Sequence, residues 1–365
     1  MGDALNSDGP KSVGSLTIID VGHGSCAVIA GKDSAVLVDS GPSASVLEYL
    51  LEQGIRIIDT VVLSHADSDH IRGLVALLGA DDFEVRRVLL NTDSAKSSEI
   101  WQSLAYEVDD CRRRHQLDLQ VQLREGDEIS VDIPGVELSV LAPRDRLVML
   151  GPGARDHLDR RLTSNSVSAV ILVKVEDRRL ALITGDLDEI GFDHLRDTRQ
   201  DLSAEILVFP HHGGLSGSNP VDAGLFAYQL AQAVRPRQVA ISLGRGRYPN
   251  PRPEIVEGIR TGAAEARVAC TQLSGECCPK IPNVSATHLL PLYARGRRDG
   301  VCCAGTMRVD LGHDDGLLPK ADGHMDYIRQ VAPASALCTR VLPQQRDAGS
   351  AKYADSKDGH AGKGG

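Results

Sequence analysis

Four residues with metal-binding side chains fall within six positions of this chain, at His65, Asp67, Asp69 and His70. Nitrogen and oxygen donors of this kind suit zinc or manganese. Without a cation, the two carboxylates would repel each other, and each would raise the pKa of the other. A polar loop that only caps a helix needs one such residue and not four. The spacing therefore predicts a metal centre.

Two later turns carry further ligand-type residues. Asp186 follows an apolar run at 180–184, and a carboxylate at the end of a strand is well placed to bridge two cations. An isolated Gly-Asp pair is also common in turns. The interpretation of Asp186 as a metal ligand therefore depends on the other ligand-type residues around it. His211 and His212 follow the apolar run 205–209. Two adjacent histidines after a buried strand are rarely both core residues, because each imidazole needs hydrogen-bond partners.

Apolar runs and glycine-bearing turns predict the elements that position these residues. A strand at 61–63 leads into the first metal turn, and apolar residues at helical spacing follow it from Ile71. Short strands with glycine-bearing turns between residues 16 and 39 predict an antiparallel meander. Residues 97–115 predict a long charged helix, and residues 144–161 a glycine-rich loop that could act as a lid. Final strands at 267–273 and 304–311 are expected to pair.

The run His-x-Asp-x-Asp-His resembles the metal-binding signature of the metallo-β-lactamase superfamily. More narrowly, it is similar to the hydrolase domain of ComEC/Rec2 competence proteins, in which Asp replaces the middle His. Asp-Val-Gly-x-Gly, Leu-Val-Asp-Ser-Gly, Gly-Asp and Pro-His-His-Gly resemble other motifs of that branch, in the same order. The resemblance covers about residues 15 to 312. It implies an α/β fold, a four-layer αββα sandwich.

The same resemblance implies a centre with two divalent metal ions, zinc or manganese. The implied metal ligands are His65, Asp67, Asp69, His70, Asp186 and His212. His65 and Asp67 would hold one ion, Asp69, His70 and one of His211 or His212 would hold the other, and Asp186 would bridge them. Asp39 would brace the ligand loop through hydrogen bonds. His211 would act beside the metals, and Asp69 could also steer the proton of the attacking water. A hydroxide that bridges such ions is a nucleophile suited to phosphodiesters.

The chain departs from the family pattern at three places. Asn165-Ser166-Val167 stands where many members have a ligand His, as in ComEC-type proteins. A Tyr-Gly-His-Pro pattern is replaced by Tyr248-Pro249-Asn250-Pro251, which loses its His. His23 stands where the branch usually has Gln. We interpret His23 either as a turn residue or as a substrate contact. One of the adjacent residues His211 and His212 is expected to be a metal ligand, and His212 is favoured.

The candidate substrate-binding residues are His23, Asn165, Ser166, Arg245 and Arg247. Arginines near the predicted cleft, Arg72 and Arg252 among them, could bind phosphate or could be solvated surface charges. The resemblance implies a phosphodiester substrate, in particular single-stranded nucleic acid, and so a phosphodiesterase or nuclease. The alternatives are a hydrolase of small carboxylic, lactam or thioester substrates and a metal-poor, non-catalytic binding module.

The composition is that of a globular protein, with 42% hydrophobic and 25% charged residues. With a net charge of −10, the chain has no overall basic field that would attract nucleic acid or anionic membranes, but a local basic rim is allowed. No apolar stretch approaches the roughly 20 residues that span a bilayer, and residues 1–15 lack a signal-peptide pattern. The expectation is a cytoplasmic protein without a membrane partner, carrying only the hydrolase part of the channel-forming competence proteins.

The chain has eight cysteines. Cys26 and Cys111 are expected to be isolated core residues, whereas five cysteines gather between residues 270 and 303. In a reducing compartment these are either buried thiols or a structural zinc site, with Cys270, Cys277, Cys302 and Cys303 as the candidate ligands.

The expected organisation is one hydrolase domain at residues 15–312, with a cysteine-bearing insertion at 274–301. A flexible N-terminus is expected at 1–14 and a C-terminal extension at 313–347. Residues 348–365 are rich in Gly, Ser, Asp and Lys, a composition typical of a disordered tail.

Overall fold

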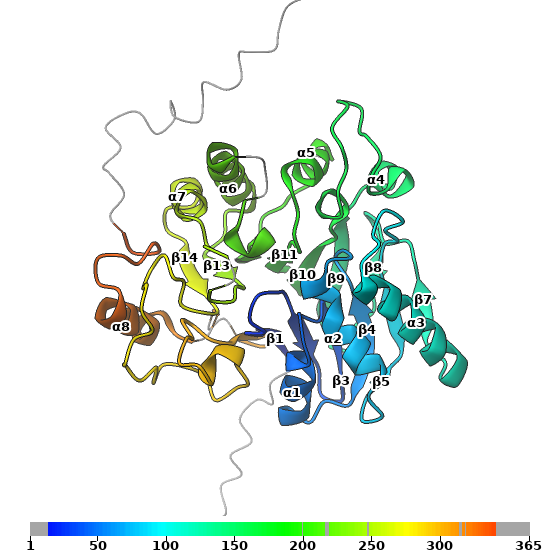
Figure 1. Cartoon of the computed structure of the whole chain (residues 1–365), viewed down its shortest axis with the longest axis horizontal. Coiled ribbons are helices and arrows are strands. Elements are labelled where there is room, and N and C mark those ends of the chain that lie inside the picture. The colour runs from blue at the N-terminus through cyan, green and yellow to red at the C-terminus, as the bar shows by residue number, and fades with distance from the viewer. Residues whose placement is uncertain are drawn as a thin grey trace, which may run out of the picture.

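The computed structural model describes residues 14–340, apart from 199, 216–218, 247, 314–315 and 318. Two β-sheets face each other in the middle of the molecule, and helices cover their outer faces (Figure 1). The four-layer αββα sandwich expected from the sequence is confirmed. The expected tail at 348–365 and all but the last residue of the expected N-terminal segment lie outside the described residues.

The first sheet contains the predicted antiparallel meander, which continues into parallel strands. A short strand, β5 (Glu84–Val85), pairs with β4 at its side. The main strands in spatial order are β15 (Met307–Asp310), β1 (Ser15–Ile18), β2 (Ala27–Ala30), β3 (Ser34–Val38), β4 (Ile57–Val62), β6 (Arg87–Leu89) and β7 (Asp118–Gln120).

The second sheet is parallel from β14 to β11 and antiparallel from there to β8. Its strands in spatial order are β14 (Arg267–Cys270), β13 (Gln238–Ile241), β12 (Ile206–Val208), β11 (Arg178–Ile183), β10 (Val170–Val175), β9 (Val136–Ala142) and β8 (Glu128–Ile129).

Apolar side chains from both faces of each sheet are buried, which explains why the strands read as continuous apolar runs. In β3, Val36 and Val38 join the core between the sheets, while Leu37 joins the core under the helices. The helices over the first sheet are α1 (Ser45–Glu52), α2 (Ser68–Leu78) and α3 (Glu99–Arg114). Those over the second are α5 (Glu189–Asp197), α6 (Pro220–Val234) and α7 (Pro253–Gly262). Within the described residues, none of the helices is both long enough and apolar enough to cross a bilayer.

Two sequence-based expectations about secondary structure are wrong. The last two strands do not pair, because β14 pairs with β13 in the second sheet and β15 with β1 in the first. An isolated bridge between Gln272 and Cys302 and a few backbone hydrogen bonds, such as Ala304 N–H to the carbonyl oxygen of Cys270 (2.8 Å), join the two segments instead. Apolar periodicity identifies a strand but not its partner. The loop expected at 144–161 begins with helix α4 (Asp145–Leu150), whose Leu147 is buried.

A small separate core joins the cysteine-bearing insertion to the segment that follows the last strand. Helix α8 (Ala321–Val331) contributes Tyr327 and Ile328 to this core, and the insertion side contributes Cys277 and Cys303. Part of the insertion is therefore packed against a helix of the C-terminal extension.

The first half of α2 lies directly against the turn after β3. Ser40 Oγ donates a hydrogen bond to the carbonyl oxygen of His70 (2.7 Å) and accepts one from the backbone N–H of Leu74 (2.9 Å). A Cβ atom at Gly73 would lie 1.9 Å from the carbonyl oxygen of Ser40. Only glycine allows this approach, and the approach fixes the helix that carries Asp69 and His70.

Gly73→Ala should therefore destabilise the protein, because the added methyl group forces α2 away from Ser40. Overpacking of this kind costs about 1–3 kcal/mol, and a clash with backbone places the expected loss at the upper end. Urea unfolding followed by circular dichroism measures the free energy of unfolding. Gly275→Ala is the matched control, since a Cβ atom there meets nothing within 4 Å. Equal stability of the two variants would contradict the prediction.

Candidate metal centre

Three turns bring ligand-type side chains to one place at the edges of the two sheets. His65 and His70 come from the turn between β4 and α2, and Asp186 follows β11. His212 lies in the 3₁₀ segment Pro210–Gly213, directly after β12, which is the parallel neighbour of β11. These four residues are at most 5% exposed. The convergence expected from the sequence is present.

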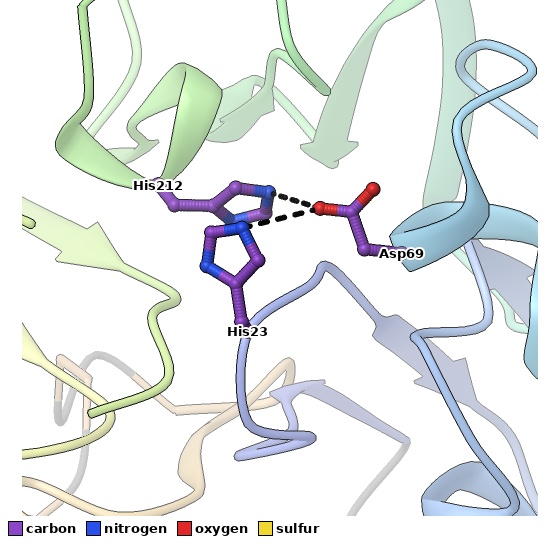
Figure 2. Close-up of side chains that lie close together, drawn as sticks. All are labelled: His23, Asp69 and His212. Carbon is purple, nitrogen blue, oxygen red and sulfur yellow. Dashed lines mark ion pairs between the residues drawn. The ribbon is translucent and has the colours of Figure 1, made fainter. Parts of the chain in front are cut away.

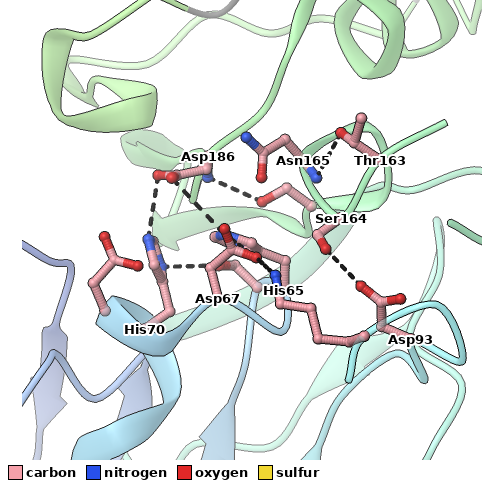
Figure 3. A network of polar contacts seen from close by, with 12 residues as sticks. His65, Asp67, His70, Asp93, Thr163, Ser164, Asn165 and Asp186 are labelled. Atoms are coloured by element: carbon pink, nitrogen blue, oxygen red, sulfur yellow. Dashed lines mark hydrogen bonds and ion pairs between the residues drawn. The ribbon is translucent and has the colours of Figure 1, made fainter. Parts of the chain in front are cut away.

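One group of ligand atoms consists of His65, His70 and Asp186, all within 4.8 Å of one another (Figure 3). The Nε2 atom of His65 lies 3.8 Å from Asp186 Oδ2, and that of His70 lies 3.3 Å from Asp186 Oδ1. The Asp186 backbone N–H donates to Ser168 Oγ (3.0 Å), which fixes the turn that presents the carboxylate.

A second group consists of His23, Asp69 and His212, also within 4.8 Å of one another (Figure 2). The Nε2 atoms of His23 and His212 lie 3.5 and 3.3 Å from the same oxygen, Asp69 Oδ2. His212 Nε2 is also 3.6 Å from Asp186 Oδ1. The Asp186 carboxylate therefore lies close to both groups, as a bridging ligand must.

The other ring nitrogen of each buried imidazole is held by a hydrogen bond. His70 Nδ1 donates to Asp39 Oδ2 (2.7 Å), and His212 Nδ1 donates to the carbonyl oxygen of Ser242 (2.9 Å). Ser64 Oγ gives its proton to Asp39 (2.8 Å), so at 2.9 Å it accepts one from His65 Nδ1. In each neutral ring the lone pair is therefore on Nε2, the nitrogen that faces the carboxylates.

Within the described residues, the Nε2 atoms of His65, His70 and His212 are buried and have no hydrogen-bond partner. Buried polar atoms without a partner are costly, and a lone pair that faces a carboxylate oxygen is repelled by it. A cation between them satisfies both. The donor set of imidazole nitrogen and carboxylate oxygen therefore fits a divalent metal such as zinc or manganese.

Asp39 is the residue that braces the first metal turn, as the sequence predicted. It is fully buried and has a left-handed backbone (φ 60°). Its carboxylate accepts hydrogen bonds from the Ser64 backbone N–H (2.8 Å), from Ser64 Oγ and from His70 Nδ1. Such outer hydrogen bonds orient a metal-binding imidazole and raise its basicity.

The electrostatics of the centre favour positive charge. Burial opposes ionisation of Asp186, but the imidazoles of His70 and His212 outweigh burial and hold its pKa well below the usual range. Burial likewise disfavours the charged form of His70, yet Asp186 and Asp39 raise the pKa of His70 well above its ordinary value. For Asp69, burial is outweighed by His212 and His70, which lower its pKa.

His211 lies at the rim of the centre, with 32% of its side chain exposed. Its Nδ1 atom is 3.3 Å from Asp186 Oδ2 and 3.3 Å from Asn165 Nδ2. His211 and His212 both have left-handed backbones (φ 55° and 54°), which L-residues rarely adopt. This turn sends the two neighbouring imidazoles to different positions: His212 into the buried group and His211 toward the rim.

Asp67 differs from the other predicted metal ligands. Its Oδ1 atom is 3.9 Å from His65 Nε2, but Asp67 belongs to neither of the two groups. Instead, the ammonium group of Lys96 forms an ion pair with the same oxygen. Sequence reasoning missed Lys96, because a lysine in a polar loop carries no signal that identifies a partner 29 residues away.

The structure corrects two of the candidate substrate contacts. Ser166 is 1% exposed and donates to Asp188 Oδ2 (2.6 Å), so it fixes the turn rather than facing a substrate. Arg245 is used internally, because its guanidinium donates to the carbonyl oxygens of Leu273 (2.6 Å), Cys278 (2.6 Å) and Pro279 (3.0 Å). The contacts with Cys278 and Pro279 bind the insertion to the domain.

The remaining candidates are placed as follows. Asn165 lies beside His211 at the rim, and Arg247 lies outside the described residues. Arg252 lines the cleft that opens over the centre, a cavity of about 470 Å³. The cleft is lined by His23, Asp67, Ser68, Asp69, Asp186, His211, His212, Gly214, Leu215, Tyr248, Pro249, Asn250 and Arg252.

The late cysteines lie outside the candidate metal-binding groups of the described residues. Within the described residues, no group of three ligand atoms within 4.8 Å of one another includes a cysteine. Cys302 points toward Asp20 (Sγ to Oδ2, 3.6 Å), and the adjacent Cys303 points toward His324 (Sγ to Nε2, 3.2 Å). Burial raises the pKa of both thiols. The alternative of buried thiols applies to Cys277, Cys302 and Cys303, whereas Cys270 is partly buried.

Sequence reasoning also missed the role of Asp20, which is fully buried below the turn that carries His23. Asp20 Oδ1 accepts a hydrogen bond from Gln272 Nε2 (2.8 Å), and Oδ2 accepts one from the backbone N–H of Gly296 (2.9 Å). Its own N–H donates to Thr306 Oγ1 (3.0 Å). Asp20 therefore anchors the His23 turn to segments far along the chain, which local pattern does not indicate.

Two curated proteins are similar in sequence to much of this chain. The competence protein ComA of Neisseria gonorrhoeae is 26% identical over 272 residues, which are 73% of this chain and 32% of that protein. The ComE operon protein 3 of Bacillus subtilis is 23% identical over 272 residues, 68% of this chain and 30% of that protein. This chain thus spans about a third of the length of the curated relatives it matches.

A solved structure, the metallo-beta-lactamase fold protein YhfI of Bacillus subtilis, is similar over 70% of this chain and 96% of that chain, with 13% identity and a TM-score of 0.42. The family model of the metallo-beta-lactamase superfamily matches residues 19–217 of the 365. This match covers more than half of the chain and every turn that carries a residue of the two ligand groups. The chain belongs to the metallo-beta-lactamase superfamily.

Proposed function

We propose that this protein is a binuclear-metal phosphodiesterase that cleaves a nucleic-acid strand or a nucleotide diester. One observation carries the proposal: three buried Nε2 atoms without hydrogen-bond partners, on His65, His70 and His212, face the carboxylates of Asp69 and Asp186 beside an open cleft. Family membership supports metal-dependent hydrolysis, and the two ligand groups support two ions rather than one.

His65 and His70 would hold one ion, Asp69 and His212 the other, and Asp186 would contact both. When bound, a pair of divalent ions lowers the pKa of a water molecule and withdraws charge from a phosphoryl oxygen. This grouping differs from the assignment expected from the sequence, in which His70 shared an ion with Asp69. The Lys96 ammonium already pairs with Asp67. We therefore assign Asp67 at most a weak contact with the ion that His65 and His70 would hold.

The residues at the floor and the rim of the cleft would carry the proton transfers. As the oxygen of water bonds to phosphorus, the bond from phosphorus to the leaving oxygen breaks. Asp69, which lines the cleft, would orient the attacking water and accept its proton. We assign His211, which lines the cleft and is partly exposed, to donating a proton to the leaving oxygen.

The phosphate group would be bound by Arg252, the arginine that lines the described cleft. Arginine binds phosphate oxygens through two parallel hydrogen bonds. The similarity to competence proteins over about a third of their length supports a nucleic-acid substrate. The net charge of −10 argues against an extended basic groove, so few phosphates would be contacted at once.

The first test is hydrolysis of bis-p-nitrophenyl phosphate and of a short single-stranded oligonucleotide, each with zinc, manganese or magnesium. We expect turnover that depends on added metal, and Asp186→Ala should lower the rate by about three orders of magnitude, because the bridging carboxylate is lost. Asp197→Ala, which removes an exposed carboxylate on α5, is the control and should keep full activity.

Unchanged turnover of Asp186→Ala at matched metal loading would show that the chemistry lies elsewhere. Turnover of a lactam or thioester, without cleavage of any phosphodiester, would identify a hydrolase of small carboxylic substrates instead. Metal binding without turnover of any of these substrates would favour a non-catalytic binding module.

Asp39→Asn should weaken metal binding without blocking folding. An amide side chain of the same shape still fits the buried position, but it cannot accept all three hydrogen bonds from Ser64 and His70. Loss of such an outer partner typically costs about 10–100-fold in metal affinity. Competition with a chromophoric zinc chelator measures this change, and Asp33→Asn, an exposed substitution, should leave the affinity as it is.

Binding of the oligonucleotide to metal-depleted protein should weaken only gently as salt rises. The logarithm of the binding constant falls by roughly 0.7 per logarithmic unit of salt for each phosphate neutralised on a single strand, and we expect one or two such contacts. Arg252→Gln should weaken binding and reduce this slope, whereas Arg86→Gln, a half-exposed arginine paired with Asp59 and Glu84, should change neither. A steep slope unaffected by Arg252→Gln would instead indicate a broad basic surface.

A further inference from the structure

We propose that His23 is itself a metal ligand in this protein and shares one ion with Asp69 and His212. The inference rests on the binuclear centre proposed above and adds a ligand to it. The ComEC-type hydrolases that this chain resembles usually have Gln at this position, so the extra imidazole is a feature of this chain.

The distances agree with coordination. Zinc binds imidazole nitrogen and carboxylate oxygen at about 2.0–2.2 Å, so neighbouring donors on a tetrahedral ion lie about 3.4 Å apart. His23 Nε2 is 3.5 Å and His212 Nε2 is 3.3 Å from Asp69 Oδ2. Figure 2 shows the two rings reaching the same carboxylate oxygen from separate segments of the chain.

Hydrogen bonding alone explains the positions of His23, Asp69 and His212 less well. An N–H···O hydrogen bond has its donor and acceptor about 2.7–3.2 Å apart, and both contacts with Asp69 are longer. His212 Nδ1 already donates to the carbonyl oxygen of Ser242 (2.9 Å), so in the neutral ring Nε2 carries a lone pair. A lone pair 3.3 Å from a carboxylate oxygen is repulsive unless a cation lies near both.

The turn that carries His23 is built against the residues that hold the other two ligands. Ser242, whose carbonyl oxygen orients His212, donates through its Oγ to the carbonyl oxygen of Gly24 (2.7 Å). The backbone N–H of Ser25 donates to the carbonyl oxygen of Asp69 (3.3 Å). A Cβ atom at Gly24 would lie 2.4 Å from that same oxygen. Position 23 is therefore held against Asp69 and His212 by backbone contacts.

An additional ligand changes the relative affinities with which the two ions are bound. The ion near His23 would have two imidazoles and one carboxylate, with Asp186 Oδ1 also 3.6 Å from His212 Nε2. The ion near His65 would have two imidazoles and Asp186, and the nearby Asp67 is already paired with Lys96. We therefore expect the ion at His23 to be bound at least as tightly as the other.

The test is metal binding by the full chain, measured without reference to activity. Protein stripped with a chelator is titrated with zinc by calorimetry, its bound metal is counted by elemental analysis, and its cobalt-substituted form is followed by visible absorption. We expect two zinc ions in the natural protein. His23→Gln should weaken one of them by about 100-fold or more, since loss of an outer partner alone costs about 10–100-fold, and should change the cobalt spectrum.

Two further variants distinguish a ligand from a structural residue. His23→Asp offers a carboxylate in place of the imidazole and should recover part of the affinity that His23→Gln loses. His115→Gln removes a histidine at the end of α3, far from the centre in sequence, and should bind two ions like the natural protein. Thermal unfolding of the metal-free proteins should show equal stability of His23→Gln and the natural protein.

The outcomes separate this inference from the proposed function. Two ions bound with unchanged affinity and spectrum in His23→Gln would overturn the role of His23 and leave the binuclear centre intact. A single ion in the natural protein would overturn the binuclear centre. In that case, loss of the ion in His23→Gln would still support His23 as a ligand, and its retention would overturn that role.

Discussion

Imidazole lone pairs that face carboxylate oxygens inside the protein are the constraint on which the rest of this structure depends. His65, His70 and His212 each have Nδ1 held by a hydrogen bond, which turns Nε2 toward Asp69 or Asp186. Such an arrangement is repulsive between neutral rings and ionised carboxylates, and it is favourable around a cation. Burial of these groups is unfavourable unless a positive charge lies near them. Metal binding and the stability of the centre are therefore coupled.

The sandwich supplies the rigidity that this arrangement needs. Parallel neighbours β11 and β12 end at the same edge of the second sheet and deliver Asp186 and His212, while β4 of the first sheet delivers His65. The contact of Gly73 with Ser40 then fixes the angle of α2 and with it the positions of Asp69 and His70. Ligands that come from ends of strands in two packed sheets can be held within a fraction of an ångström, because the core between the sheets resists displacement.

The amino-acid sequence predicted the position of the metal centre, because that position depends on local signals, and the resemblance of these motifs to the metallo-β-lactamase superfamily implied the fold class. Ligand-type residues at fixed spacing after apolar runs identify His65 to His70, Asp186 and His212 without knowledge of partners. Contacts between distant segments were not predictable in this way. The pairing of Lys96 with Asp67, the use of Arg245 by the insertion, and the division of β14 and β15 between two sheets all depend on tertiary neighbours. Charge and periodicity show what a residue can do, but not which group it meets.

The hydrogen bonds of Asp20 carry a consequence for biosynthesis. Its partners Gln272, Gly296 and Thr306 lie 252, 276 and 286 residues later in the chain. At ribosomal speeds of about 5–20 residues per second, these partners emerge roughly ten seconds to a minute after Asp20. The two early strands that flank His23 must therefore wait, incomplete at their β15 edge, while the turns with His65, Asp186 and His212 are made. The turn that carries His23 is therefore anchored after the segments that carry His65, Asp186 and His212 have been synthesised.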